Sequence, residues 1–122
     1  MRQWFPSMSS RDVLKLLFDV ERACVLAIKF TRDRTFEAFL EDELLQSAVE
    51  RQSEIIGEAL RQAVDLDPSL SDRLPDIRRI IAFRNRLVHG YADVSLPIVW
   101  RIVNRDVPKL LDEVRAILAE SS

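Results

Sequence analysis

The chain has 122 residues, of which 48% are hydrophobic, and a formal net charge of −2. This length predicts one domain, because it leaves no room for a second core. A single cysteine, Cys24, excludes an internal disulfide and a cysteine-based zinc site, and a single histidine excludes a histidine cluster. No secretory or membrane-spanning segment is apparent, so we expect a cytoplasmic protein with no membrane partner, metal or cofactor.

Helices are predicted throughout, because the chain has only two glycines and its apolar residues recur at three- and four-residue steps. Ser9 and Ser10, followed by Asp12, predict the start of the first helix, and residues 1–8 are interpreted as a short extension. The buried stripe of this helix is predicted to be Val13, Leu16, Leu17, Val20, Cys24, Ala27 and Ile28. We expect an all-α, up-and-down bundle of four to five helices over residues 1–122.

The second long helix is predicted to begin at Asp42. Before it, Thr35 is placed to cap a short helix, Phe36 to Leu40, whose phenylalanines close one end of the bundle. Gly57 costs about 1 kcal/mol in a helix interior and therefore predicts a close crossing by another helix. The buried side of this helix is predicted to be Leu45, Ala48, Val49, Ile55, Ile56, Ala59, Leu60 and Ala63.

In the second half of the chain, two further helices are predicted after a loop. Residues 65–74 are predicted to be a loop, with Pro75 in the first turn of the next helix. Ser95 is placed to cap the last helix, whose apolar stripe keeps its phase past Pro108. This proline should therefore kink the last helix and not end it.

Glu54 and Glu58 lie one turn apart on the second long helix. The same spacing occurs where paired carboxylates hold a metal, but we favour ion pairs with Arg51 and Arg61 because no histidine accompanies the carboxylates. Alternatively, one of the two carboxylates reaches Arg84. The sequence leaves open which of the two it is.

The segment from Arg84 to Tyr91, called the octet below, holds the only histidine and the only tyrosine of the chain. The apolar stripe of its helix runs through Arg84, and a charge on such a face requires a partner. Gly90 suits the position just past a helix end, which places His89 at the cap, where the helix dipole favours a protonated imidazole. At about 100° per residue, His89 lies about 140° round the helix from Arg84, and Tyr91 returns to within about 20° of it.

With its pattern of Arg84-Asn85, His89 and Tyr91, the octet resembles the HEPN ribonuclease toxins of the HepT type. Residues 36–42, residues 54–59 and Val99-Trp100 also agree with that family, so the resemblance covers most of the chain. It implies an HEPN helical bundle and the toxin of a type VII-like toxin–antitoxin system. In that system a homodimer cuts RNA at its interface without a metal, and a minimal nucleotidyltransferase antitoxin inactivates it by transferring AMP to a tyrosine, here Tyr91.

The residue types of the octet suit this chemistry. Arg84 is a permanently charged fork that matches phosphate oxygens, and His89 is the only side chain whose unperturbed pKa allows acid and base catalysis near neutrality. Asn85 can orient the substrate or hydrogen-bond across an interface. In RNA cleavage, the ribose 2′-oxygen attacks the phosphorus on one side and the 5′-oxygen leaves on the other, so the reaction calls for a separate base and acid. A two-fold dimer, which supplies two histidines, therefore fits better than one chain.

Two alternatives remain at this point. Arg84 and His89 can simply cap a helix and satisfy a carboxylate, in which case the chain is a catalytically inactive HEPN module that binds a nucleotidyltransferase or a nucleotide. The acidic overall charge argues against a general nucleic-acid binder, but basic residues predominate from Arg73 to Lys109, where the octet lies. The sequence therefore favours the nuclease.

Overall fold

The computed structural model describes residues 8–89 and 95–121, and this part of the chain is helical with no strand. Its helices in order are α1 (Met8–Thr31), α2 (Phe36–Leu40), α3 (Glu43–Leu66), α4 (Leu70–Arg73), α5 (Ile77–His89), α6 (Leu96–Arg101), the π-helix η2 (Ile102–Asp106) and α7 (Val107–Glu120). The predicted all-α bundle with a kinked last helix is confirmed. None of these helices is long and apolar enough to cross a membrane. Residues 1–7 of the predicted extension lie outside the described residues.

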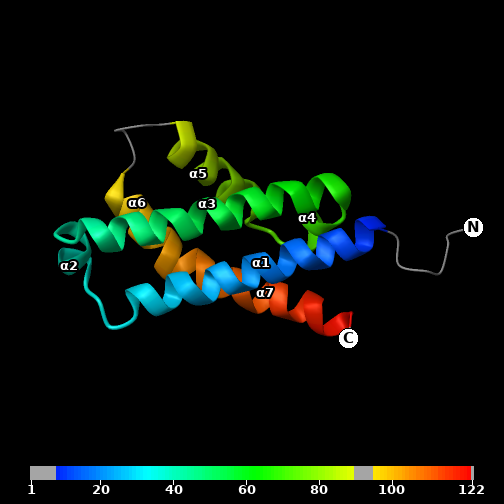
Figure 1. Cartoon of the computed structure of the whole chain (residues 1–122), viewed down its shortest axis with the longest axis horizontal. Coiled ribbons are helices and arrows are strands. Elements are labelled where there is room, and N and C mark those ends of the chain that lie inside the picture. Colours follow the sequence, from blue (N-terminus) through cyan, green and yellow to red (C-terminus); the bar gives the residue numbers. More distant parts are fainter. Residues whose placement is uncertain (1–7, 90–94, 122) are drawn as a thin grey trace, which may run out of the picture.

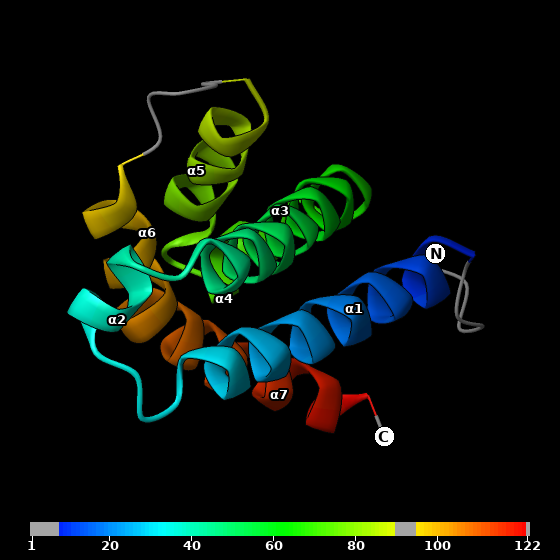
Figure 2. The same cartoon turned by 60° about the vertical axis from the view of Figure 1, so that its left-hand side comes forward.

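The bundle is organised around α3, which lies between α1 and α5 (Figure 1). The helices α1 and α3 run antiparallel and pack along most of their length, and α7 packs on another side of α1 (Figure 2). In contrast, α5 packs mainly against α3 and lies at the edge of the bundle. The octet is therefore carried by a helix with one buried and one open side.

Two of the predicted caps, Thr35 and Ser95, are present, and Asp42, predicted as the start of the second long helix, caps α3. The Oγ1 of Thr35 accepts a hydrogen bond from the Ala38 amide (3.1 Å), Oδ1 of Asp42 accepts one from Leu45 (3.0 Å), and Oγ of Ser95 accepts one from Ile98 (3.5 Å). The predicted start of the first helix was wrong, because α1 begins at Met8, upstream of both serines. Serine is tolerated within a helix, and no glycine or proline separates Met8 from the apolar stripe.

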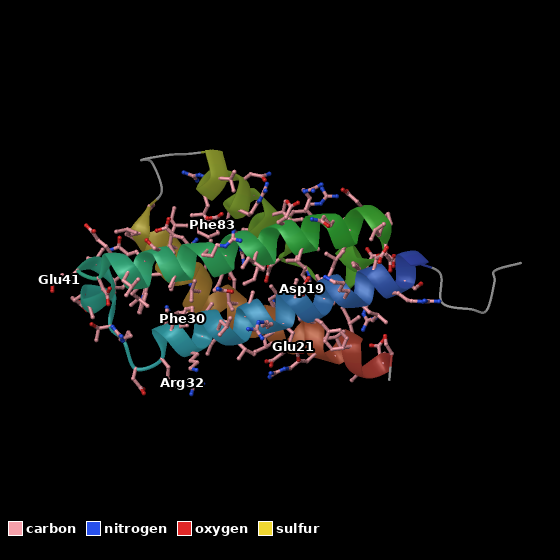
Figure 3. All side chains as sticks on the ribbon, in the orientation of Figure 1. Asp19, Glu21, Phe30, Arg32, Glu41 and Phe83 are labelled. Atoms are coloured by element: carbon pink, nitrogen blue, oxygen red, sulfur yellow. The ribbon has the colours of Figure 1, made fainter. Side chains whose placement is uncertain are left out.

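The core follows the predicted stripes closely. Cys24 is fully buried, and this burial raises the pKa of its thiol to about 12. At one end of the bundle Phe39 is fully buried with its ring 5.1 Å from that of Trp100, which confirms that α2 closes that end. Phe83, which the sequence analysis did not select, is 7% exposed and lies on the side of α5 that faces α3 (Figure 3).

The predicted loop at 65–74 is partly wrong, because it contains the short helix α4. Leu70 and Leu74 are buried, and Arg73 forms an ion pair with Glu120 of α7. Burial of the two leucines, four residues apart, favours a helical turn over an open loop. Pro75 precedes α5, which begins at Ile77, so the expected proline in the first turn is also displaced by two residues.

The last helix continues through Pro108 by way of the π-helix η2. The Val107 amide donates to the carbonyl of Ile102, five residues back, so the chain is wound more widely just before the proline. Proline has no amide hydrogen and crowds the carbonyl four residues before it. The wider turn accommodates the proline without ending the helix.

Candidate active site

The first six residues of the octet, Arg84 to His89, lie in α5 (Ile77–His89). The predicted helix end at Gly90 falls outside the part of the chain that the structure describes. The side chain of His89, Gly90 and the predicted modification site Tyr91 lie outside the described residues. The geometry of the site is therefore given by Arg84, Asn85 and their neighbours on α3.

Gly57 and Arg84 mark the point where α3 and α5 cross. A Cβ atom added to Gly57 would lie 2.2 Å from Cβ and 2.7 Å from Cγ of Arg84. These distances are too short for any real side chain, so the predicted close crossing at Gly57 is confirmed. The crossing fixes the first carbon atoms of Arg84 against the backbone of α3.

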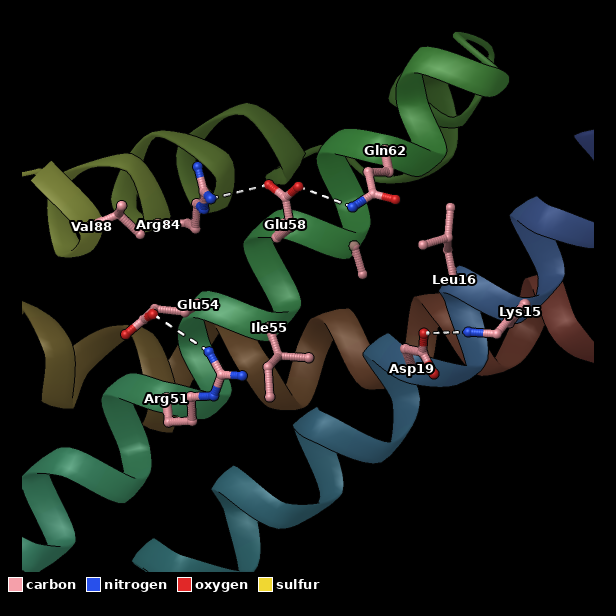
Figure 4. Close-up of a pocket in the computed structure, with 11 residues that line it drawn as sticks. Lys15, Leu16, Asp19, Arg51, Glu54, Ile55, Glu58, Gln62, Arg84 and Val88 are labelled. Atoms are coloured by element: carbon pink, nitrogen blue, oxygen red, sulfur yellow. Dashed lines mark hydrogen bonds and ion pairs between the residues drawn. The ribbon is translucent and has the colours of Figure 1, made fainter.

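The guanidinium group of Arg84 reaches a carboxylate one residue further along α3. Its Nη2 atom lies 3.2 Å from Oε1 of Glu58 (Figure 4). Glu54 instead pairs with Arg51 at 3.8 Å. Of the two carboxylates that the sequence left open, Glu58 is thus the partner of Arg84.

Glu58 is itself held by two further side chains of α3. Arg61 donates from Nε to Oε1 (3.0 Å) and from Nη2 to Oε2 (2.8 Å), and Gln62 donates from Nε2 to Oε2 (2.9 Å). These hydrogen bonds, first from Arg61 and then from Gln62, together with the charges of Arg61 and Arg84, lower the pKa of Glu58 to about 2. Glu58 is therefore a fixed negative charge at neutral pH.

Asn85 holds the other end of the guanidinium. Its Oδ1 atom accepts a hydrogen bond of 3.0 Å from Nη1 of Arg84. The Nε atom of Arg84 is buried and has no partner among the described residues, and the whole side chain is 21% exposed. Since a guanidinium carries five N–H groups, Arg84 keeps donors on its Nη atoms for a further acceptor.

A cleft of about 370 Å³ lies beside Arg84, between α1, α3 and α5 (Figure 4). It is lined by apolar side chains and by charged side chains of both signs, and the lining residues are Lys15, Leu16, Asp19, Arg51, Glu54, Ile55, Glu58, Ala59, Gln62, Arg84 and Val88. Within residues 8–89 and 95–121, no three acidic, cysteine or histidine side chains come close enough together to hold a metal ion.

The sequence analysis identified Arg84 and Asn85, and its expected ion pairs of Glu54 with Arg51 and of Glu58 with Arg61 are confirmed. It missed the hydrogen bond from Gln62 to Glu58, although residues four positions apart share one face of a helix. The contact from Asn85 to its neighbour Arg84 was also missed, because adjacent residues on a helix point about 100° apart. Only the observed side-chain conformations reveal that contact.

An all-α bundle that carries this octet at the end of α5 is the architecture of an HEPN domain. The family model described as Ribonuclease HepT-like matches residues 20–117, most of the chain. The chain therefore belongs to the HepT-like ribonuclease family, as its octet indicated.

Several archaeal proteins are similar to nearly the whole chain. A candidate RNase of Methanocaldococcus jannaschii is 33% identical over 112 residues, which cover 90% of this chain and 100% of that protein. A second candidate RNase of the same organism is 32% identical over 115 residues, 93% of each chain. The probable ribonuclease HepT of Thermococcus cleftensis is 36% identical over 102 residues, 84% of this chain and 89% of its own. No solved structure is a significant match.

Proposed function

We propose that this chain is a metal-independent endoribonuclease and the toxin of a type VII-like HEPN and nucleotidyltransferase pair. The observation that carries the proposal is the fixed position of Arg84, which α3 and Asn85 hold five residues before His89 on the same helix. Membership of the HepT-like family and the RNase names of its relatives support RNA as the substrate.

The cleavage step needs only the octet. The ribose 2′-oxygen attacks the neighbouring phosphorus and loses its proton, the bond to the 5′-oxygen breaks, and that oxygen gains a proton, which leaves a cyclic phosphate. Arg84 binds the non-bridging phosphate oxygens with the Nη donors that Glu58 and Asn85 leave unused. His89 transfers a proton, because its unperturbed pKa lies near neutrality.

The proposed enzyme is a homodimer. On a regular helix, positions 84 and 89 are about 140° apart and about 7.5 Å apart along the axis, so one α5 presents them in different directions. Each chain also has only one histidine. A two-fold axis next to the edge helix α5 would bring Arg84 of one chain toward His89 of its partner and supply a separate acid and base.

The proposed partner is a minimal nucleotidyltransferase antitoxin, as the family resemblance implies. Tyr91 comes two residues after His89 in the sequence. AMP on its hydroxyl would place a negative phosphodiester near Arg84 and Arg86, where it would compete with an RNA phosphate.

A second candidate function is a catalytically inactive HEPN module that binds a nucleotidyltransferase or a nucleotide. One observation favours it. The ion pair with Glu58 is by itself a sufficient structural reason for the charge of Arg84 on the buried side of α5. Only the first candidate function predicts that the protein cleaves RNA.

The experiment is cleavage of a labelled RNA by purified protein in EDTA. We expect cutting by the wild-type protein, and none by Arg84→Ala or His89→Ala variants whose helical circular dichroism is unchanged. Arg22→Ala, on the exposed side of α1, is the charge-matched control and should remain active. Cutting that survives His89→Ala, or that stops in EDTA, contradicts the mechanism. An inactive wild-type protein that binds the nucleotidyltransferase supports the second candidate.

A further inference from the structure

The open side of α5 carries four exposed residues, Arg78, Ala82, Asn85 and Arg86, which we call the basic stripe. At about 100° per residue, these positions and position 89 fall within an arc of about 100°. Ile77, Ile80 and Phe83 lie outside this arc and are buried. The basic stripe therefore lies on the same side of α5 as the proposed catalytic position 89.

The arginines of α5 fall into two classes. Arg79 pairs with Asp76 (3.3 Å) and Asp106 (2.9 Å), and Arg84 pairs with Glu58. Among the described residues, Arg78 and Arg86 form no ion pair with a carboxylate. The helix itself contains no acidic residue, so both charges of the basic stripe are uncompensated along α5.

Ala82 lies between these two charges, one turn from each. Because the side chain of Ala82 is small, it does not project between Arg78 and Arg86, and a ligand can approach both guanidinium groups. The distance from Arg78 to position 89 along the axis is about 16 Å. The stripe thus extends from the proposed site toward the start of α5.

We propose that the basic stripe binds the phosphate backbone of RNA next to the scissile phosphate, with Arg78 and Arg86 as phosphate contacts. This inference rests on the proposed function. A polyanion suits two uncompensated arginines that flank a small residue. A second copy of the chain suits them less well, because α5 offers no carboxylate to pair with them across a two-fold axis.

Ala82→Glu tests the proposal without changing either arginine. Residues four positions apart pair on a helix, so the new carboxylate would lie beside both Arg78 and Arg86 and would not weaken the helix. Ala82→Gln is the control, with nearly the same shape and no charge. Both changes are made in a His89→Ala background, and binding of a labelled single-stranded RNA is measured by fluorescence anisotropy across a salt series.

We expect Ala82→Glu to weaken RNA binding about 25-fold at 0.1 M salt, because each phosphate contact on a single strand contributes a salt slope of about 0.7 and there are two contacts. The slope should fall by about 1.4. Ala82→Gln should bind within about twofold of its parent. Arg78→Ala should weaken binding about fivefold, and Arg78→Lys should retain most of it because the charge is kept.

Equal RNA binding by the Ala82→Glu and Ala82→Gln proteins, together with RNA cutting by the wild type, would overturn this inference and leave the proposed function standing. If the Ala82→Glu protein loses self-association in sedimentation while Arg78→Ala still binds RNA like its parent, the stripe is a subunit contact and the inference is wrong. If the His89→Ala parent binds no RNA and the wild type cuts none, the proposed function fails with it.

Discussion

Gly57 and Arg84 are in contact so close that a single added carbon atom on Gly57 would overlap the side chain of Arg84 at 2.2 Å. The contact links the packing of α5 on α3 to the candidate active site. The absence of a Cβ atom at Gly57 lets α5 approach α3, and this approach places Arg84 beside Glu58. A change at Gly57 should therefore affect both stability and activity.

We predict that Gly57→Ala destabilises the protein by about 1–3 kcal/mol, even though alanine is the better helix former by about 1 kcal/mol. The overlap involves Cβ of Arg84 and not the flexible end of its side chain, so α5 must move away from α3. Chemical denaturation measures the stability, and RNA cleavage should fall with it. Ser47→Ala, at an exposed position of α3, should be neutral or stabilising. A Gly57→Ala protein as stable as wild type would contradict the close crossing.

Glu58 should contribute to the pH dependence of stability. Its pKa in the folded protein is lowered to about 2. Between about pH 2 and the ordinary pKa of a glutamate, Glu58 is therefore charged in the folded state, while the same carboxylate in the unfolded chain takes up a proton. The stabilisation is complete above about pH 4.5 and is lost as the pH falls toward 2. We predict that the difference in unfolding free energy between wild type and Glu58→Gln is largest at neutral pH and shrinks across this window.

The matching control for that experiment is Glu54→Gln, which removes a carboxylate one turn away whose ion pair with Arg51 is longer, at 3.8 Å. This control separates the loss of a negative charge on α3 from the loss of the hydrogen bonds that Arg61 and Gln62 donate to Glu58. A Glu58→Gln difference that stays constant between pH 5 and about 2 would show that Glu58 has an ordinary pKa.

Glu58 is also expected to position Arg84 during cleavage. Without the carboxylate, Arg84 loses its partner on α3, and a displacement of about 1 Å in such a group can cost about a hundredfold in rate. We predict that Glu58→Gln lowers kcat about ten- to a hundredfold with KM unchanged or lower, because a negative charge next to the RNA phosphate is removed. A rise in KM with normal kcat would assign Glu58 to substrate binding instead.

Much of the fold could be predicted from the sequence, because helix periodicity and capping are local. Thr35 and Ser95 have the predicted capping bonds, and Gly57 predicted a helix crossing without naming the partner helix. The short helix α4 could not be predicted in this way. Its burial of Leu70 and Leu74 depends on tertiary packing that no local pattern in residues 65–74 shows.

The site was predicted less completely than the fold. Arg84 was identified because a charge interrupted an apolar stripe, but the choice between Glu54 and Glu58 depends on the register at which α5 crosses α3. Nothing in either helix alone gives that register. The hydrogen bond from Arg84 to Asn85 likewise depends on side-chain conformation, since neighbouring positions on a helix diverge.

Tyr91 is expected to be the regulatory residue. In the proposed modification, the hydroxyl of Tyr91 would attack the α-phosphorus of ATP on the nucleotidyltransferase, pyrophosphate would leave, and AMP would remain on the chain. With the partner, magnesium and ATP, intact-mass spectrometry should show one or more added AMP units and the loss of RNA cleavage. Tyr91→Phe should fold normally, remain unmodified at that residue and stay active. An unmodified wild-type chain that is nevertheless inhibited would mean that the antitoxin acts by covering the site.

In the proposed dimer, Arg84 of one chain and His89 of its partner form one site, and mixing two inactive chains tests this composite site. Arg84→Ala and His89→Ala chains with different affinity tags are co-expressed, and the mixed dimer is isolated through both tags. We predict that each homodimer is inactive, while the mixed dimer, which has one intact Arg84 and one intact His89 on opposite chains, regains part of the wild-type cleavage in EDTA. A mixed dimer that forms but cuts no RNA, or a wild-type protein that sediments as a monomer while still cutting, would contradict the composite site.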